Sequence, residues 1–114
     1  MDILILKEKY GSQILAGNKS WELRNNNTKK RGRIFIAYSK TSEIFGEIEI
    51  YDTVKLTKEI FDNNRDKHLS ESSWDILAAK YKNPYAWLLK NPLLYDVPIP
   101  YNHPKGAIIW VKGV

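Results

Sequence analysis

A short segment near the N-terminus gathers the side chains that are best suited to chemistry. Residues 17–24 read GNKSWELR and bring together the ammonium of Lys19, the carboxylate of Glu22 and the guanidinium of Arg24. A carboxylate can accept a hydrogen bond from the exocyclic amine of a nucleobase, and a guanidinium can bind a phosphate or a base edge through two hydrogen bonds. The alternative is a surface ion pair worth about 0–1 kcal/mol. Spacing alone favours that ion pair, because exposed strands often carry mixed charges.

The alternation of residue types in this segment is typical of a β-strand. Trp21 and Leu23 then face one way, while Glu22 and Arg24 project together from the opposite face with Ser20 beside them. We therefore expect Trp21 to point into the core and the two charged side chains to share one surface.

Two further segments place polar side chains where a binding site could form. Ser39 and Lys40 end a predicted strand and bring a hydroxyl and an amine to a sheet edge. Residues 98–107 hold Tyr101 and His103 in a loop that prolines stiffen, and rigid loops on a scaffold are common sites of function. The alternative for this loop is simple turn chemistry, with His103 exposed and unengaged.

The chain is rich in aromatic residues, with four tryptophans and seven tyrosines. Aromatic rings interleaved with cations are suited to stacking with nucleobases. Trp74 and Trp110 lie in apolar patterns and are predicted to belong to the core. Tyr38, Tyr85 and Tyr101 are better candidates for the rim of a site.

Positive charge is concentrated in one part of the chain. The net charge is +5, and residues 23–42 hold six basic residues and no acidic one, so the remainder is close to balanced. A localised positive patch is expected of a protein that binds a polyanion. The alternative is a solvated basic loop that keeps the protein soluble. If nucleic acid binds, the loop residues predicted to contact its backbone are Lys29, Lys30, Arg31 and Arg33.

Composition excludes several other classes of site. A length of 114 residues suits one domain over residues 1–114, and 43% hydrophobic with 27% charged residues is ordinary for a globular protein. The absence of cysteine removes disulfides, thiolate catalysis and zinc knuckles, and two histidines offer too few ligands for a transition metal. Neither a glycine-rich phosphate loop nor a Gly-x-Ser-x-Gly motif is present. We expect no metal and no cofactor.

The sequence gives no sign of a membrane partner. No segment approaches the roughly 20 apolar residues that span a bilayer, and the N-terminus lacks the basic and long apolar regions of a secretory signal. We therefore expect a cytoplasmic protein.

Strands cluster along the chain, with helices inserted in two places. This order does not resemble regular βαβ alternation, and it predicts an α+β fold with a small, strongly curved mixed sheet or barrel. Three prolines in residues 85–101 predict an edge strand or a bent ribbon there. Strands are expected at 2–6, 19–24, 33–39, 43–56, 85–101 and 106–113, and helices at 7–17, 56–62 and 69–81.

The motif residues resemble a known family. Residues 14–24, ILAGNKSWELR, look like the signature of the ASCH domain, which is a glycine, a lysine and then Glu-x-Arg, here Gly17, Lys19, Glu22 and Arg24. The segments GRIFIAYSK, GEIEI, KLT and HPKGAIIWV follow in the order of the family. The resemblance therefore covers nearly the whole chain.

The resemblance implies a small PUA-like mixed β-barrel flanked by two or three helices. It also implies binding of RNA or another nucleic acid in a cleft lined by the Gly-x-Lys and Glu-x-Arg segment. The residues then expected to bind the ligand, which is RNA or a modified nucleotide, are Lys19, Glu22, Arg24, Ser39, Lys40 and Tyr101.

Two other functions stay open. A small bacterial branch of the family hydrolyses N4-acetylcytidine with a lysine, a threonine three residues later and a glutamate in the helical insert. Lys19 matches that lysine, but Glu22 stands in the threonine position, and Glu71 lies in the insert. As an amidohydrolase of modified nucleosides, the protein would use Lys19 and Glu22 as catalytic residues. The third possibility is a protein-interaction domain with an incidental basic loop.

Overall fold

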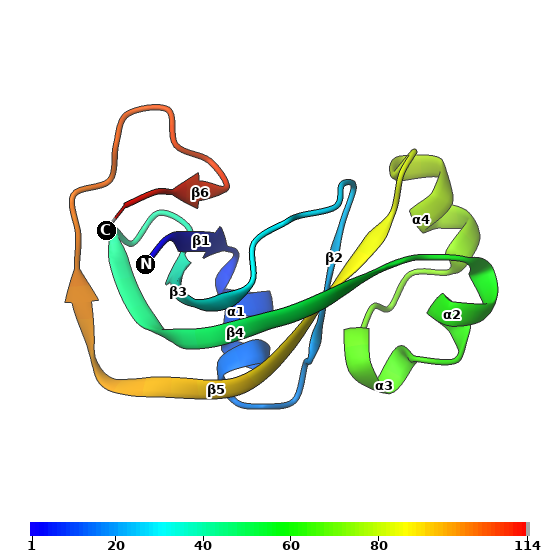
Figure 1. Cartoon of the computed structure of the whole chain (residues 1–114), viewed down its shortest axis with the longest axis horizontal. Coiled ribbons are helices and arrows are strands. Elements are labelled where there is room, and N and C mark those ends of the chain that lie inside the picture. The colour runs from blue at the N-terminus through cyan, green and yellow to red at the C-terminus, as the bar shows by residue number, and fades with distance from the viewer. Residues whose placement is uncertain (114) are drawn as a thin grey trace.

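The computed structural model describes residues 1–113 as one curved sheet with four helices (Figure 1). The sheet has six strands in the order β2-β5-β4-β3-β1-β6. Strands β1 and β3 are parallel and the other neighbours are antiparallel, so the sheet is mixed. The strands are β1 (Ile3–Leu6), β2 (Trp21–Arg24), β3 (Gly32–Tyr38), β4 (Glu43–Lys55), β5 (Tyr85–Pro100) and β6 (Trp110–Val111), and the helices are α1 (Glu8–Leu15), α2 (Lys58–Asp62), α3 (Arg65–His68) and α4 (Trp74–Lys80).

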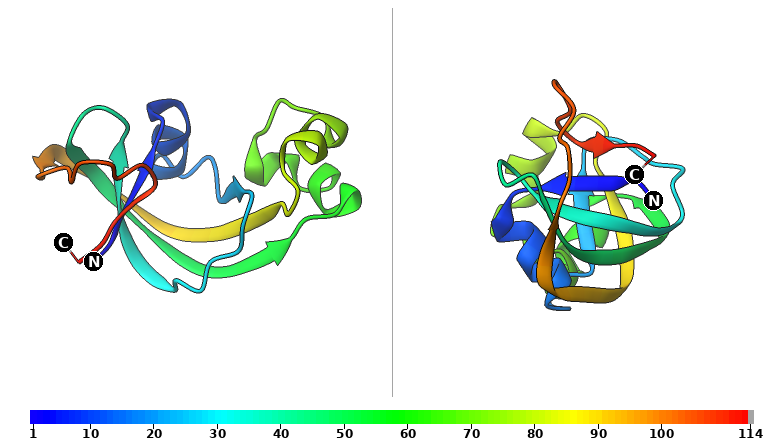
Figure 2. Two further views of the ribbon diagram at one scale, coloured as in Figure 1. Left: turned by 90° about the horizontal axis from the view of Figure 1, so that it is seen from above. Right: turned by 90° about the vertical axis from the view of Figure 1, so that its left-hand side faces the viewer.

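The sheet curls into a half-barrel, which confirms the predicted α+β fold and its barrel-like sheet (Figure 2). Its curvature comes from the long β4–β5 hairpin, whose pairing shifts register at three points. Gly46 lies at one of these shifts. A side chain at Gly46 would meet the carbonyl oxygen of Leu93 at 2.3 Å, so the two strands can approach this closely only at a glycine.

The proline-containing strand β5 is more central than the sequence suggested. The prediction of an edge strand is wrong for residues 85–88, which pair with β2 on one side and β4 on the other. Beyond residue 88 the strand bends and pairs with β4 alone. All three prolines lie in this later part, where a missing N–H does not interrupt a second ladder.

The helices differ from prediction mainly at their ends. Thr57 caps α2, since its side chain accepts a hydrogen bond from the Ile60 N–H. Helix α4 begins after Ser73, which caps it, and so starts later than the helix that the sequence predicted from residue 69. Helix α3 is a fourth helix where two or three were expected, because four residues are too few for an apolar period to show in the sequence.

The last strand is shorter than predicted, with two residues in place of eight. Gly106 has a φ of +85°, and the Ala107 N–H donates to the Pro104 carbonyl at 3.1 Å. The chain therefore turns through residues 104–107 before it reaches β6.

Two separate cores support the cavity described below. The barrel core surrounds Ile36 and Trp87, whereas a second core around Phe61 and Leu77 holds together the helical lobe, defined here as residues 57–81 with α2, α3 and α4. Trp21 is buried in this second core, as predicted. Helix α1 and the helical lobe rise on the same side of the sheet, with β2 between them (Figure 2, left).

Two of the core predictions hold only in part. Trp74 and Trp110 are half-buried and pack against the edges of the cores.

No helix within residues 1–113 has the length and apolar character needed to cross a bilayer.

Candidate nucleotide-binding cavity

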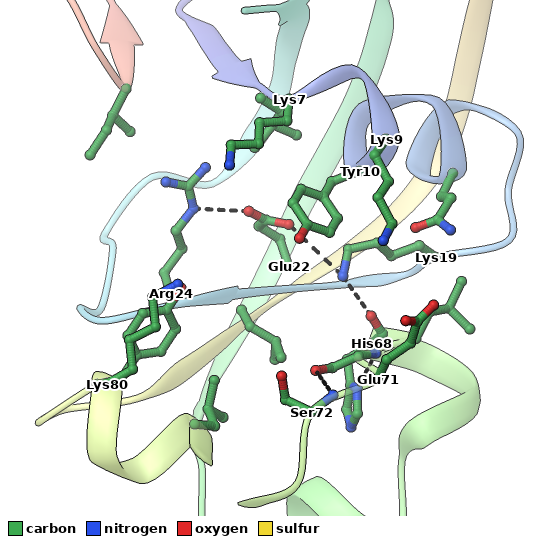
Figure 3. A pocket seen from close by; sticks show the side chains of 18 of the residues that line it. Lys7, Lys9, Tyr10, Lys19, Glu22, Arg24, His68, Glu71, Ser72 and Lys80 are labelled. Atoms are coloured by element: carbon green, nitrogen blue, oxygen red, sulfur yellow. Dashed lines mark hydrogen bonds and ion pairs between the residues drawn. The ribbon is translucent and has the colours of Figure 1, made fainter.

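A cavity of about 550 Å³ lies between α1, β2 and the helical lobe. Its wall also includes the segment between α3 and α4 and the loop that precedes β6. The charged side chains that line it point toward one another from these elements (Figure 3). The cavity is large enough for a nucleotide, because ligand pockets in proteins typically span about 300–1,000 Å³.

Lys19 enters the cavity because helix α1 ends abruptly. Gly17 adopts a φ of +82°, and the N–H groups of Asn18 and Lys19 both donate to the Gln13 carbonyl, which turns the chain toward β2. The Lys19 side chain is 5% exposed, and its Nζ donates to the His68 carbonyl at 2.6 Å. Burial lowers the pKa of Lys19, and the nearby Glu22 carboxylate acts against that shift.

Glu22 lies between two cations. Its Oε2 accepts a hydrogen bond from Arg24 Nε at 2.9 Å, and its Oε1 is 4.0 Å from Lys19 Nζ. Burial raises the pKa of Glu22, while Arg24 and Lys19 act in the opposite direction. The exposed ion pair that spacing alone favoured is therefore wrong, because Glu22 is 6% exposed and forms the wall of a cavity.

Arg24 extends over the face of Trp87, with 5.5 Å between the guanidinium carbon and the ring centroid. A cation above an aromatic ring is stabilised by the negative face of the ring. Its Nε points to Glu22, so the guanidinium is oriented from two sides. The shared face predicted for Glu22 and Arg24 is confirmed.

His68 joins the helical lobe to β2. Its ring is fully buried and stacked on Phe61 at a centroid distance of 4.2 Å. The Ser70 N–H donates to Nδ1 at 2.9 Å, so Nε2 carries the proton and donates to the Phe61 carbonyl at 2.8 Å. The backbone of His68 accepts from Lys19, and the neighbouring Lys67 carbonyl accepts from the Ser20 N–H at 3.0 Å.

Three further cations line the cavity that the sequence patterns did not predict. Lys7 and Lys9 come from the start of α1 and Lys80 from the end of α4. With Lys19 and Arg24 they make five cationic side chains against two acidic ones, Glu22 and Glu71. Their proximity is created by the packing of distant elements, so no local spacing could have revealed it. The sequence shows only that lysines occur at the start of the helix predicted at 7–17 and at the end of the helix predicted at 69–81.

The remaining predicted ligand residues divide into two groups. Ser39 lines the cavity, whereas Lys40 and Tyr101 are not among the residues that line it within 1–113. Lys40 is exposed with a φ of +69°. Tyr101 packs against a third hydrophobic cluster, which includes Ile3 and Ile44, and its hydroxyl is 2.9 Å from His103 Nδ1. His103 Nε2 in turn is 2.8 Å from the Ala107 carbonyl, so His103 is engaged within its own loop.

Tyr38 and Tyr85, which the sequence also predicted at the rim of the site, are not among the described residues that line the cavity. Tyr38 is buried in the barrel core and stacks on Phe45 at 3.9 Å between ring centroids. Tyr85 is half-buried and packs against the same core. Tyr10 on α1 instead brings an exposed aromatic ring to the cavity.

The basic loop is largely neutralised by carboxylates. Lys30 pairs with Asp2, which also accepts from the Gly113 N–H. Arg31 is 3.9 Å from Asp52. The other paired loop residue is Arg33, whose Nε donates to Glu47 at 2.9 Å and whose Nη1 donates to the Asn91 carbonyl at 3.0 Å. Lys29 is exposed.

Within residues 1–113, no cluster of three or more histidine, aspartate or glutamate side chains is placed to hold a metal ion.

Comparison with known proteins agrees with this architecture. The family model of the ASCH domain matches residues 4–98. The crystal structure of ASCH from Zymomonas mobilis is similar with a TM-score of 0.71 and 19% identity, over 87% of this chain and 72% of that one. Comparison with curated proteins finds no match.

Two variant structures of the same Zymomonas mobilis protein are also similar. A tyrosine-to-phenylalanine variant has a TM-score of 0.67 and 19% identity over 87% of this chain and 74% of that one. A serine-to-alanine variant has a TM-score of 0.70 and 17% identity over 96% of this chain and 85% of that one. At this level of identity the likeness concerns the fold.

Proposed function

This chain belongs to the ASCH domain family, and we propose that it binds RNA or a modified nucleotide in the cavity between α1, β2 and the helical lobe. One observation carries the proposal: the buried Lys19 and Glu22 and the half-buried Arg24 form one cluster in the wall of a nucleotide-sized cavity with an excess of positive charge. Such charge attracts polyanions, and a carboxylate held among cations provides an acceptor for a base.

Each side chain has a role in this proposal. Lys19 and Arg24 contact a phosphate or a base edge, Glu22 accepts a hydrogen bond from the base, and Ser39 lines the wall. The basic loop residues and Lys40 and Tyr101, which lie outside the cavity, are candidates for contacts with RNA that extends beyond it.

The test is binding of a fluorescently labelled single-stranded RNA, measured by anisotropy at two salt concentrations. Neutralisation of phosphates by five cations should weaken binding roughly 100-fold between about 50 and 200 mM salt. Arg24→Ala should weaken it further, by about 1.5–3 kcal/mol, because a charged donor is lost. Lys55→Ala, which removes an exposed lysine outside the cavity, is the matched control and should change little. Salt-independent binding, or full affinity in Arg24→Ala, would exclude the proposal.

One observation favours a second candidate, a small amidohydrolase of modified nucleosides. Glu71, from the helical insert, lines the same cavity as Lys19 and Glu22. Burial lowers the pKa of Lys19, and a lysine with a lowered pKa is unprotonated in a larger fraction of molecules near neutral pH, so that its amine can accept a proton.

Incubation with N4-acetylcytidine and related nucleosides, followed by chromatography, separates the two candidates. Turnover that disappears in Lys19→Ala would support the enzyme. A panel without turnover, together with salt-dependent RNA binding, would favour the binding module. Absence of any nucleic-acid binding at low salt would instead indicate a protein-interaction domain.

A further inference from the structure

The three charged side chains of β2 and the turn before it form an ordered row. Glu22 lies in the middle, with Arg24 bonded to one carboxylate oxygen and Lys19 closest to the other (Figure 3). Lysine and arginine only donate hydrogen bonds, whereas an ionised glutamate only accepts them. The row therefore presents a donor, an acceptor and a second donor to the cavity.

Each member of the row keeps capacity for a ligand. The Lys19 ammonium has three N–H donors and uses one of them on the His68 carbonyl. Among residues 1–113, Arg24 donates through Nε, which leaves both Nη groups without a protein acceptor. Glu22 Oε1 has only the 4.0 Å contact with Lys19, which is too long for a hydrogen bond.

The free oxygen of Glu22 is accessible to a ligand. Within residues 1–113, every fully buried side-chain nitrogen or oxygen has a hydrogen-bond partner. Because Oε1 has no such partner, it is not fully buried and opens into the cavity that Glu22 lines.

The row is held in place before any ligand arrives. Glu22 pairs with Trp87 in the antiparallel β2–β5 ladder, and the ring of Trp87 supports the Arg24 guanidinium. Lys19 is held by the backbone of His68, whose ring is fixed at both nitrogens. Preorganised groups bind with less loss of conformational entropy, and they discriminate better between ligands of similar size.

We propose that this row selects the imide edge of a uracil-type base. An imide presents a carbonyl, an N–H and a second carbonyl in that order, and it complements a donor, an acceptor and a donor at all three positions. This inference rests on the proposed function and specifies the base that the cavity takes.

With other base edges, one member of the row would face a group with which it cannot form a hydrogen bond. Cytosine places the lone pair of N3 next to its exocyclic amine, so a central carboxylate would face an acceptor. Guanine carries one carbonyl and two donors, so one cation would face a donor. A buried polar group without a partner costs about 1–3 kcal/mol, which corresponds to roughly a 5- to 150-fold loss of affinity.

The first test compares ligands that differ only in the base. Uridine, cytidine, guanosine and N3-methyluridine monophosphates are titrated against the full chain by calorimetry. We expect the uridine nucleotide to bind at least about tenfold more tightly than the others. N3-methyluridine keeps both carbonyls and replaces the N–H by N–CH3, so it removes the donor that would contact Glu22. Equal affinities for uridine and N3-methyluridine, or tighter binding of cytidine, would overturn the inference.

The second test exchanges the acceptor. Glu22→Gln can present either its oxygen or its N–H₂, so the preference for uridine over cytidine should fall to within about threefold. Glu59→Gln makes the same change at an exposed residue outside the cavity and should leave the preference intact. An unaltered preference in Glu22→Gln would contradict the inference, and if that variant does not fold, the N3-methyluridine comparison decides alone.

The two levels of the proposal fail in different ways. If no nucleotide and no RNA binds, the proposed function is wrong and the imide selection falls with it. If nucleotides bind with equal affinity whatever their base, the binding function stands and only the imide selection is wrong.

Discussion

Glu22 compensates two cations that would otherwise be left in a poorly solvated wall. Removing one partner of a buried ion pair is costly, because the remaining charge keeps its desolvation penalty without the attraction. We expect Glu22→Ala to lower the free energy of unfolding by about 3 kcal/mol, measured by urea denaturation. Lys90→Ala removes a half-exposed partner of Glu49 at 3.8 Å and should cost less than about 1 kcal/mol. Equal losses in the two variants would show that the Glu22 cluster behaves as a surface pair.

His68 makes stability depend on pH. Burial lowers its pKa below the ordinary value of 6.5, with the nearby Lys19 and Arg65 cations acting in the same direction. The unfolded chain therefore binds this proton more readily than the folded one, so stability is full above pH 6.5 and is lost as pH falls toward the folded pKa.

Urea denaturation between about pH 7 and pH 5 measures this effect. We expect the free energy of unfolding to decrease on acidification in the wild type and to decrease less in His68→Gln. The control is His103→Gln, which changes a histidine in an exposed loop and should keep the wild-type slope. A slope that disappears in His103→Gln and persists in His68→Gln would contradict the assignment.

At the level of residues, the sequence located the central cluster but not its surroundings. Strand alternation placed Glu22 and Arg24 on one face, since side-chain direction along a strand is a local property. His68 and Lys80 reach the cavity through the packing of the helical lobe, and a local pattern carries no information on such long-range contacts. The spacing of the residues also does not show that Glu22 is buried. Because Glu22 is buried, the ion pair that was predicted on the surface forms part of a cavity wall.

Among the elements, the β4–β5 hairpin depends on a single glycine. A methyl group at Gly46 would collide with the Leu93 backbone at 2.3 Å, and backbone cannot move away as a flexible side chain can. We expect Gly46→Ala to destabilise the fold by about 3 kcal/mol in thermal or urea unfolding.

Gly32 provides a matched comparison for this prediction. Its φ is +101°, and a side chain there would meet nothing within 4 Å, so Gly32→Ala carries only the conformational cost of about 1–2 kcal/mol. A smaller loss for Gly46→Ala than for Gly32→Ala would mean that the strands can separate at the crossing.

The predicted elements were most accurate where the signal is local. Helices α1 and α2 lie within the ranges 7–17 and 56–62 that the sequence predicted, because helical periodicity is a local signal. The position of β5 inside the sheet does not, because alternation identifies the two faces of a strand but not its neighbours. Strand β6 is shorter than predicted because the chain turns through residues 104–107, and the apolar pattern of the sequence does not reveal this turn.

For the whole molecule, the distribution of paired and unpaired cations predicts where salt dependence arises. Lys7, Lys9 and Lys80 line the cavity, whereas Lys30 and Arg33 are already bonded to carboxylates. Cations that release a carboxylate before binding a phosphate gain less from the exchange.

The slope of log affinity against log salt measures this difference. Replacing the three cavity lysines by alanine should reduce the slope by about 2, at roughly 0.7 for each phosphate contact with a single strand. Lys30→Ala combined with Arg33→Ala should reduce it by less than one such contact per residue. A larger reduction in the loop variant would place the phosphate path over the loop.

Strand β1 and strand β6, the first and last strands of the sheet along the chain, lie side by side and away from the helical lobe (Figure 1). The carboxylate of Asp2 accepts the Gly113 N–H at 3.0 Å and also pairs with Lys30, which lies 4.7 Å from the Trp110 ring centroid. Asp2 and Gly113 therefore lie next to each other, so attachments made at these two positions can reach one support, a sensor chip or a pair of loop ends in a host protein, without spanning the molecule. In such an assembly the helical lobe would face away from the support.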